Sequence, residues 1–327
     1  MTPSRYAVRT FGFRGRWGQI YRIEEGFRRI GCRIASEDEA FDFIYSNELL
    51  QDRGAIELKA RTGKPLIRHV HDLPALEGTP GERSATTLRE NRQAILESSD
   101  AITTNTRFVA GQLARYWDYR DAIITGQPIQ FDPDLADFRS RPRRHLAVMV
   151  GRLADPLKNA ELALRALALL RAPPDLAMVW VGKAKSKPRS LFRRFRIEHY
   201  EEIAPVALAA LIRDARMLLA PSLFEGLGLP PIEALALGTP AIVSDIPVKR
   251  EVFAGVPMLF HDPHDPTSLA RAIETLLDDE AADWAMVEGL APQVEFYLPQ
   301  TIAAKIVGIY ESLDRSAGDA AHRPPSV

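Results

Sequence analysis

The feature that most constrains this chain is an alternation of short apolar runs with longer helical patterns, which occurs twice. Short runs rich in β-branched and apolar residues predict strands, whereas apolar residues spaced three or four apart predict helices. The predicted strands of the first half are 6–11, 32–35, 41–46, 65–70, 100–105 and 121–125, and its predicted helices are 18–31, 49–63 and 108–117. The predicted strands of the second half are 146–151, 175–182, 216–222, 239–245 and 256–261, and its predicted helices are 157–172, 204–215, 230–238, 265–279 and 301–313. Strands that alternate with helices indicate an α/β fold, in which helices cover both faces of a parallel sheet.

The two alternating regions are separated by residues 126–144, which lack clear periodicity and contain three prolines. Such a stretch is typical of a linker. We therefore expect two α/β domains, over residues 1–140 and 141–300, and a disordered tail over 316–327. Because open α/β sheets bind ligands beyond the carboxyl ends of their strands, the cleft between two such domains is the expected place for a site.

Composition excludes several classes of protein. With 42 basic and 43 acidic residues the net charge is −1, so the chain has no overall preference for an anionic or cationic partner. The single cysteine, Cys32, excludes an internal disulfide and fits a reducing compartment. No segment reaches the roughly 20 apolar residues that a membrane-spanning helix needs, and the N-terminus is unlike a secretory signal. We expect a cytoplasmic protein.

Charge is nevertheless uneven along the chain. Residues 1–34 hold eight arginines, and residues 183–196 hold seven lysines and arginines without an acidic residue. Such runs contact phosphates, nucleic acid or anionic lipid at the inner membrane face, or form a solvated surface. The sequence leaves these alternatives open.

Residues 224–234, FEGLGLPPIEA, place two glutamates around a turn that opens a helix. Gly226 and Gly228 permit positive φ and close backbone approach, and N–H groups at a helix start suit an anion. Glu225 and Glu233 suit sugar hydroxyls, because a carboxylate accepts pairs of hydrogen bonds. The alternative is that Glu233 stabilises the helix N-terminus and Glu225 is a loop charge.

Other chemistries lack their signatures. The D-x-D sequence at 132–134 lies in the predicted linker and fits a turn better than a metal site. The chain has no G-x-G-x-x-G sequence after the first strand, no G-x-S-x-G sequence, and no cluster of cysteine and histidine with metal-ligand spacing. We expect neither a bound metal nor a dinucleotide cofactor.

The C-terminal half resembles the retaining glycosyltransferases of family 4. LLAPSLFEGLGLPPIEALALGTPAIVSD (218–245) has that family's strand ending in PS, its Glu-x7-Glu pair and its EA-x3-G-x-P sequence, and MVGRLADPLKNAELALRAL (149–167) resembles its G-R-x5-K segment. Residues 244–278 are similar to the family's ending. The resemblance implies a GT-B fold, with two Rossmann-like domains facing a central cleft and helix 301–315 returning to the N-terminal domain.

The same resemblance implies roles for single residues in the C-terminal half. By matched position, Glu225 contacts the donor sugar and Glu233 the nucleotide ribose. Arg152 and Lys158 bind the donor diphosphate, together with the backbone of Gly226, Leu227, Gly228 and Leu229. Two cations offset the charge of a departing diphosphate without a metal.

The N-terminal half resembles the family more loosely. RHVHDLP (68–74) is similar to its H-[ED]-P region, which implies that His71 contacts the donor sugar and that Asp72 is the acid beside it, although Leu73 separates Asp72 from the proline. GRWGQ (15–19) stands where the family has a glycine-rich loop, so Gly18 is matched to the donor phosphates. Asn105 and Thr106 replace the family's usual serine.

The expected activity is a metal-independent, retaining transfer of a sugar from a UDP or GDP type of nucleotide sugar to an acceptor hydroxyl. The expected acceptor is a glycan or a lipid-linked glycan. The alternatives are a nucleotide-sugar 2-epimerase of the same architecture, a glycosyltransferase that acts on modified DNA bases, and a binding module that has lost its activity. Donor identity and oligomeric state stay open.

Overall fold

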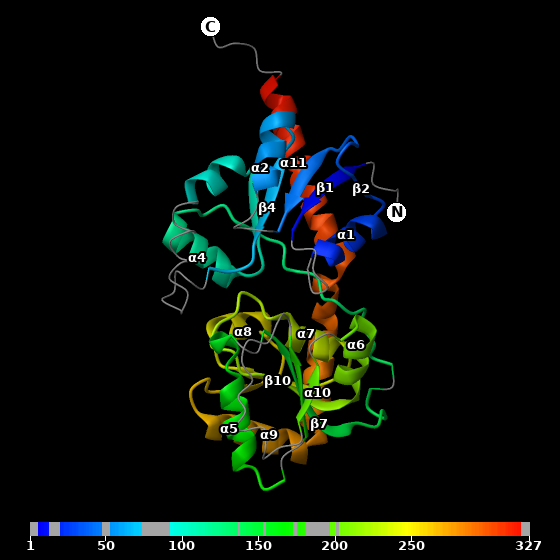
Figure 1. Ribbon diagram of the computed structural model, residues 1–327, viewed down its shortest axis with the longest axis vertical. Helices are drawn as coiled ribbons and strands as arrows, with labels where there is room; N and C mark the ends of the chain where they lie inside the picture. Colours follow the sequence, from blue (N-terminus) through cyan, green and yellow to red (C-terminus); the bar gives the residue numbers. More distant parts are fainter. Residues whose placement is uncertain are drawn as a thin grey trace. The chain divides into compact units, whose positions relative to one another are not determined.

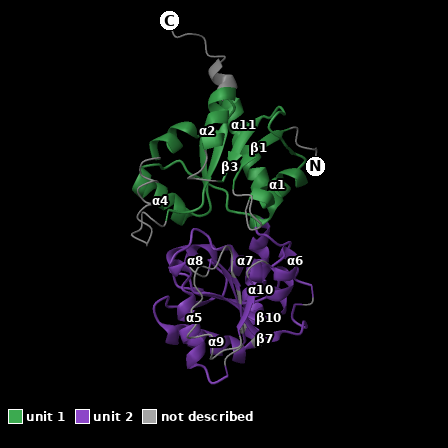
Figure 2. Cartoon of the chain, in the orientation of Figure 1, with its two compact units in different colours: residues 1–128, 296–327 green, residues 129–295 purple. Residues whose placement is uncertain are grey.

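The computed structural model describes residues 6–12, 20–47, 53–73, 92–136, 138–152, 155–172, 175–180, 197–200 and 203–321. The chain divides into two compact units (Figure 2): unit 1 comprises Met1–Pro128 with Phe296–Val327, and unit 2 comprises Ile129–Glu295. Each unit contains a six-stranded sheet in which all strand pairs are parallel. The predicted α/β fold with two parallel-sheet domains is confirmed. The predicted domain boundaries fall after residues 140 and 300, whereas the compact units divide after Pro128 and Glu295.

Unit 1 is a parallel sheet with helices on both faces (Figure 1). Its strands lie in the order β2 (Arg33–Ile34), β1 (Ala7–Phe11), β3 (Phe43–Ser46), β4 (Leu66–Val70), β5 (Ala101–Thr104) and β6 (Ile123–Ile124). Its helices are α1 (Ile20–Arg29), α2 (Arg53–Thr62), a stretch at 92–98, α4 (Arg107–Trp117) and α11 (Pro299–Ala321). Successive side chains of a strand point to opposite faces. Phe43 and Tyr45 therefore join the core that includes α1 and α11, and Ile44 joins the core that includes α2.

The C-terminal helix α11 completes the core of unit 1. Ile302, Ala303 and Ile306 are buried in one cluster with Phe27 of α1, and the two helices run side by side in Figure 1. Gly26 makes their close approach possible, because a Cβ there would lie 2.1 Å from the carbonyl oxygen of Pro299. The helix continues to Ala321, into the segment 316–327 that the sequence predicts to be disordered. Residues 322–327 lie outside the described residues.

Unit 2 has the same layered plan. Its strands lie in the order β12 (Leu259–His261), β11 (Ala241–Ser244), β10 (Ala215–Ala220), β7 (Arg144–Gly151), β8 (Asp175–Trp180) and β9 (Ile197–Tyr200). Its helices are η2 (Pro156–Lys158), α5 (Ala160–Leu169), α6 (Pro205–Asp214), α7 (Leu229–Ala236), α8 (Pro247–Val252), α9 (Pro266–Asp278) and α10 (Glu280–Leu290), and η3 (Ala291–Tyr297) follows. The sequence does not predict β9, α8, α10 or η3. The single helix predicted over 157–172 is broken at Asn159, whose φ of 52° is left-handed.

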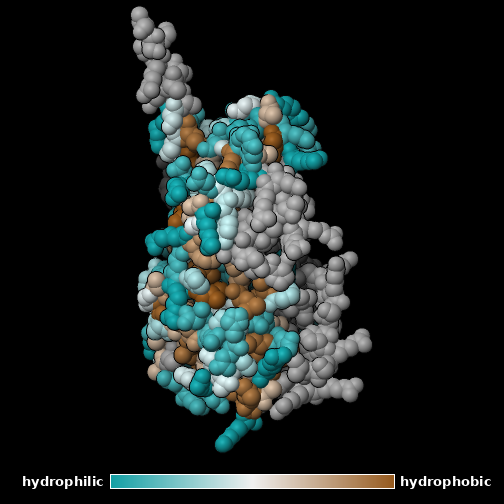
Figure 3. Space-filling view, turned by 90° about the vertical axis from the view of Figure 1, so that its left-hand side faces the viewer, coloured by the Kyte–Doolittle hydropathy of each residue, from teal (hydrophilic) through white to brown (hydrophobic). Residues whose placement is uncertain are grey.

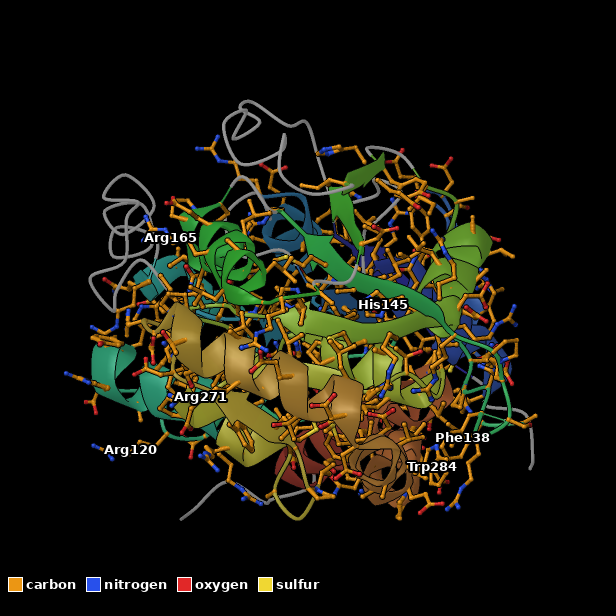
Figure 4. The ribbon with its side chains drawn as sticks, turned by 90° about the horizontal axis from the view of Figure 1, so that it is seen from below. Arg120, Phe138, His145, Arg165, Arg271 and Trp284 are labelled. Atoms are coloured by element: carbon orange, nitrogen blue, oxygen red, sulfur yellow. The ribbon has the colours of Figure 1, made fainter. Side chains whose placement is uncertain are left out.

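The predicted linker, residues 126–144, is packed structure over most of its length. Ile129 and Phe131 are buried. Arg143 pairs with the buried carboxylate of Asp283 on α10, and the guanidinium of Arg139 lies 4.9 Å from the ring centre of Trp284. Trp284 is labelled in Figure 4, which views the chain from below. The periodicity of the sequence does not predict this packing, because the side chains that make these contacts are carried by irregular backbone that is rich in proline and charged residues.

The described surface is mixed in character. On the face shown in Figure 3, hydrophilic residues cover much of the surface, with hydrophobic patches between them. No helix in the described part of the chain is long and apolar enough to cross a membrane. The basic run 183–196 and residues 1–5 and 13–19 of the arginine-rich N-terminus lie outside the described residues.

Candidate functional site

The candidate site of unit 2 is built where two neighbouring strands end. β7 ends at Gly151 and β10 at Ala220, and the two strands pair in parallel, so their carboxyl ends lie at the same edge of the sheet. The loop after β7 carries Lys158 and the loop after β10 carries Glu225. The Nζ of Lys158 donates to Oε1 of Glu225 at 2.7 Å, and the hydroxyl of Ser222 donates to the same oxygen at 2.8 Å. Lys158 and Glu225, which the sequence analysis assigns to two different parts of the donor, are thus in direct contact.

Local turns fix these two loops against each other. The carboxylate of Asp155 accepts from the N–H of Leu157 and starts the short helix η2 that ends at Lys158. Asn159 then donates through Nδ2 to the carbonyl of Pro221 at 3.1 Å and to that of Pro263 at 2.8 Å. An asparagine tolerates the left-handed backbone needed at this point. Its side chain therefore ties the lysine loop to the glutamate loop.

The glycine turn, defined here as Gly226, Leu227 and Gly228, joins Glu225 to helix α7. Gly228 has φ 75°, and α7 starts at Leu229. Lys249 on α8 lies beneath this turn with 1% of its surface exposed. Its Nζ donates to the carbonyl oxygens of Leu227, at 2.9 Å, and Gly228, at 3.0 Å. A third charged side chain, which the sequence did not reveal, is therefore part of the site.

The lysines control the ionisation of Glu225. Burial by itself raises the pKa of the Glu225 carboxyl, but the charges of Lys158 and Lys249 and the hydrogen bonds from Lys158 and Ser222 outweigh burial, and the pKa is lowered. Burial lowers the pKa of the Lys249 amine to about 8, against an opposing effect of Glu225 and a further lowering by Lys158. At neutral pH both the Lys249 amine and the Glu225 carboxylate are therefore charged.

The cavity beside this ion pair is small. The cavity lined by Lys158, Ser222, Glu225 and Pro231 has a volume of about 10 Å³, which is room for a single water molecule. Arg152, which follows β7 directly, points outward instead: 72% of its side chain is exposed and its guanidinium lies 3.5 Å from Asp155. The two cations predicted to bind a diphosphate therefore differ sharply in exposure.

Glu233 has a structural contact that the sequence does not predict. It lies in the second turn of α7, because the helix begins at Leu229, and it is 5% exposed. Its Oε1 accepts the backbone N–H of Gln130 at 2.8 Å. Ribose binding by Glu233 stays a prediction, and part of its carboxylate is already engaged with the segment that precedes β7.

Helix α7 offers fewer N–H groups than the predicted anion site assumes. The N–H groups in the first turn of a helix have no partner within the helix and suit an anion. Two of these positions are Pro230 and Pro231, which carry no N–H. The positions that still carry this group are Gly228 and Leu229.

The candidate residues of unit 1 also lie where strands end. His71 follows β4, Asn47 follows the neighbouring strand β3, and Asn105 follows β5 on the other side. The Nε2 of His71 donates to the carbonyl of Asn47 at 3.0 Å, and Nδ2 of Asn105 donates to the carbonyl of His71 at 2.9 Å. Asp72, next in the chain, is half-buried. These contacts fix the backbone and ring of His71.

A second histidine, His69, contacts His71 and Asn105 from within the sheet. His69 is buried in β4 and its ring centre lies 4.9 Å from that of His71. Its Nδ1 is 2.9 Å from the hydroxyl of Thr103 and its Nε2 is 2.7 Å from Oδ1 of Asn105. Burial, with the charge of His71, lowers the pKa of His69 to about 3, so the ring is neutral at physiological pH. Asn105 therefore links both histidines.

Three further predictions concern Gly18, a metal site and the D-x-D sequence at 132–134. Gly18 lies outside the described residues. Among the residues that the structure describes, no group of three or more His, Cys, Asp or Glu is arranged to hold a metal ion. Asp134 of the D-x-D sequence lies 3.5 Å from both Arg141 and Arg213. The structure thus assigns Asp134 to surface ion pairs.

Comparison with known proteins finds a family match in unit 2. Residues 144–279 match the model of the family described as "Glycosyl transferases group 1", and this range contains Lys158, Glu225 and the glycine turn. Residues 144–279 of this chain are therefore similar to the group 1 glycosyl transferases. The resemblance found in the sequence is thereby confirmed.

Curated relatives that match most of the chain are also glycosyltransferases by name. The D-inositol 3-phosphate glycosyltransferase of Corynebacterium glutamicum (strain R) is 27% identical over 307 residues, which cover 84% of this chain and 73% of the relative. The enzyme of the same name from Pseudarthrobacter chlorophenolicus is 25% identical over 315 residues, covering 88% of this chain and 74% of the relative. The chain is therefore a glycosyltransferase.

Solved structures show the same architecture. Sucrose-phosphate synthase from Thermosynechococcus elongatus superposes with a TM-score of 0.78 at 18% identity, covering 95% of this chain and all of that chain. Anabaena HepE, solved with UDP and glucose, superposes with a TM-score of 0.74 at 14% identity, covering 94% of this chain and all of that chain. At these identities the likeness establishes the fold alone, which is GT-B as the sequence predicts.

Lys249 and Ser222 belong to this glycosyltransferase site, although the sequence predicted no role for either residue. Ser222 is part of the matched PS sequence but received no role. Lys249 lies in SDIPVKREVF (244–253), which reads as a loop and where the charged neighbours of the lysine suggest an exposed segment. The sequence signal was Val248 and Val252, which mark the buried side of the short helix α8.

Proposed function

We propose that this glycosyltransferase retains the anomeric configuration, needs no metal, and transfers a hexose-type sugar from a nucleotide-diphosphate donor to an acceptor hydroxyl. The observation that carries the proposal is the Lys158–Glu225 ion pair at the carboxyl edge of β7 and β10, with Lys249 beneath it. This edge is where open α/β sheets bind ligands. The cluster offers cations for a diphosphate and a carboxylate for a sugar.

The cations act on the leaving group. Departure of a nucleoside diphosphate concentrates negative charge on its oxygens, and positive groups held in advance lower the free energy of that transition state. Arg152 is exposed and pairs with Asp155, and Lys158 is held by Glu225. In the proposed complex both contact the diphosphate, so that no bound metal is required for charge balance.

Glu225 orients the sugar. Lys158 and Ser222 both donate to Oε1, and among the described residues none donates to Oε2. A carboxylate fixed through one oxygen presents the other to a sugar hydroxyl. Because the pKa of Glu225 is lowered, it remains an acceptor at neutral pH.

The remaining roles complete the proposal. Glu233 binds the nucleotide ribose, and His71 with Asp72 contacts the sugar. The bond between the anomeric carbon and the diphosphate oxygen breaks as the acceptor oxygen attacks from the same face, and the acceptor's proton passes to the departing phosphate. Configuration is then retained without an enzyme-bound intermediate.

The names of the relatives direct the choice of substrates. Solved neighbours contain UDP and UDP-glucose, so UDP-glucose is the first donor to test, followed by GDP-mannose. The curated relatives are named for D-inositol 3-phosphate, so phosphorylated polyols head the acceptor screen, ahead of glycans and lipid-linked glycans. NMR of the product identifies the anomer, and a parallel reaction with EDTA tests metal independence.

Variants test the site. Glu225→Gln and Lys158→Met should each lower kcat/KM by at least about 100-fold, the effect of removing one transition-state contact. Glu161→Gln is the control, since Glu161 forms an exposed pair with Arg165 on α5 of the same unit. Wild-type turnover by both site variants would refute the assignment. Conversion of the donor to its epimer without any acceptor would replace the proposed reaction by an epimerase reaction.

A further inference from the structure

The buried amine of Lys249 is the least expected feature of unit 2. A lysine is rarely fully buried, because its charge must leave water. Here α8 places the side chain beneath the glycine turn, with its Nζ 5.8 Å from the ring centre of Phe253 and hydrogen-bonded to two carbonyl oxygens. Such a contact pattern fixes the turn from inside the unit.

Lys249 and Gly228 fit each other sterically. A Cβ at position 228 would lie 2.0 Å from Nζ of Lys249, closer than non-bonded atoms can approach, and 3.2 Å from Cγ of Glu225. The amine therefore occupies the space that a side chain at 228 would take. Glycine is needed here both for its φ of 75° and for this space.

The hydrogen bonds of Lys249 set the direction of two N–H groups. In a trans peptide the N–H points opposite to the C=O, and no peptide bond in the described part of the chain is cis. Because the carbonyls of Leu227 and Gly228 point to Lys249, the N–H groups of Gly228 and Leu229 point to the other side of the turn. These are the same two positions at the start of α7 that precede the Pro-Pro pair.

The charges around Lys249 favour an anion. Glu225 and Lys158 are the charged groups that act on the amine, and Arg250, its neighbour on α8, pairs with Asp245. With two lysines to one carboxylate, the cluster has an excess positive charge. Buried charge without a partner is unfavourable, and a diphosphate at the turn would supply one.

We propose that Lys249 is a positioning residue for the donor diphosphate: it holds the glycine turn so that the N–H groups of Gly228 and Leu229 face the phosphate oxygens, and its charge strengthens their binding through the turn. The inference rests on the proposed function, because the donor must be a nucleoside diphosphate sugar. Lys249 itself is buried and acts without touching the ligand.

A pH dependence follows from this arrangement. An anion bound at the turn favours the charged amine, so binding couples to the proton on Lys249. In the protein without a bound nucleotide, the pKa of the Lys249 amine is about 8. Affinity should therefore be constant below pH 8 and fall by up to about tenfold for each pH unit above it.

Calorimetric titration of the full chain with UDP and with GDP from pH 7 to 9 tests the inference. Wild-type affinity should fall above pH 8. Lys249→Met should bind roughly tenfold more weakly at pH 7 and show no such fall, since a coupling of one pKa unit equals a tenfold change. Lys249→Arg keeps a charge that does not titrate here and should retain affinity up to pH 9.

Lys305 supplies a matched control. Burial also lowers its pKa to about 8 and its Nζ donates to the carbonyl of Thr125, but it lies in unit 1. Lys305→Met should behave as the wild type. A wild-type affinity that stays flat from pH 7 to 9, or a folded Lys249→Met with the wild-type affinity and pH profile, overturns the role of Lys249 alone. Failure of the wild type to bind either nucleotide or to transfer sugar overturns the proposed function itself.

Discussion

Replacing Glu225 by glutamine would leave two lysines in the interior of unit 2 without the carboxylate between them. The substitution keeps the shape of the side chain and removes one charge. Only 13% of the Glu225 side chain and 21% of the Lys158 side chain are exposed, and Lys249 is almost fully buried. The loss should therefore be much larger than for a surface pair.

The magnitude follows from burial. Removing one partner of a buried pair costs about 3–5 kcal/mol, and the remaining exposure of Lys158 places this case near the lower end, at about 3 kcal/mol. In a domain of the size of unit 2, each kcal/mol lowers Tm by roughly 2–4 °C. Glu225→Gln should thus lower the Tm of the ligand-free protein by roughly 6–12 °C.

Scanning calorimetry of a double-mutant cycle measures the effect without any substrate. Lys158→Met alone also leaves a charge without its partner, whereas the double variant removes both charges. The double variant should be more stable than the sum of the single effects predicts, by about 1–3 kcal/mol. Glu161→Gln, from the exposed pair with Arg165, should change Tm by less than about 2 °C.

The pH dependence has a definite sign. The folded-state pKa of Glu225 lies below its ordinary value of 4.5, so its stabilising effect is complete above pH 4.5 and is lost as the pH falls through the folded pKa. The gap in Tm between the wild type and Glu225→Gln should therefore narrow in acid. A Tm change as small as that of Glu161→Gln, strict additivity in the cycle, or a gap that is constant from pH 7 to 3 would refute the reasoning.

Three further predictions concern single positions. Gly228→Ala should destabilise more than Gly255→Ala: both positions have positive φ, which costs about 1–2 kcal/mol, but only at 228 does the new Cβ meet the amine of Lys249. Equal Tm shifts would contradict that contact. His69 should stay neutral to about pH 3 because it is buried, and an NMR titration with a midpoint near 6.5 would show otherwise. Thr106→Ala should cost about 1 kcal/mol in denaturant unfolding, because its hydroxyl caps α4, and Thr106→Ser should restore most of it.

The layered fold was accessible from the sequence because it depends on local patterns. Strands of a parallel sheet buried on both faces read as short apolar runs, and the helices between them repeat their apolar residues at helical spacing. The short helix α8 has few turns to display such a period and lies among charged residues. β9 follows a basic run and contains Glu198 and His199, so its composition gives no strand signal.

The candidate site was accessible only in part. Lys158 and Glu225 lie in matched motifs, and their contact follows from the pairing of β7 with β10. The contacts of Lys249 and Glu233 join residues far apart in the chain: Lys249 reaches the turn from α8, and Glu233 meets Gln130 from the segment before β7. Spacing along the sequence carries no information about such contacts, and a charged residue gives no sign that it will be buried.

The position of α11 in unit 1 has a consequence for synthesis of the chain on the ribosome. Ile302 and Ile306 complete the core around Phe27, and the ribosome adds them only after all of unit 2 has been made. Unit 2 is continuous in the chain and can fold as soon as it emerges, whereas unit 1 must wait with an open apolar face until the last helix arrives. Chains cut short before Pro299 should therefore expose that face, and we expect them to be the species that chaperones and proteases recognise.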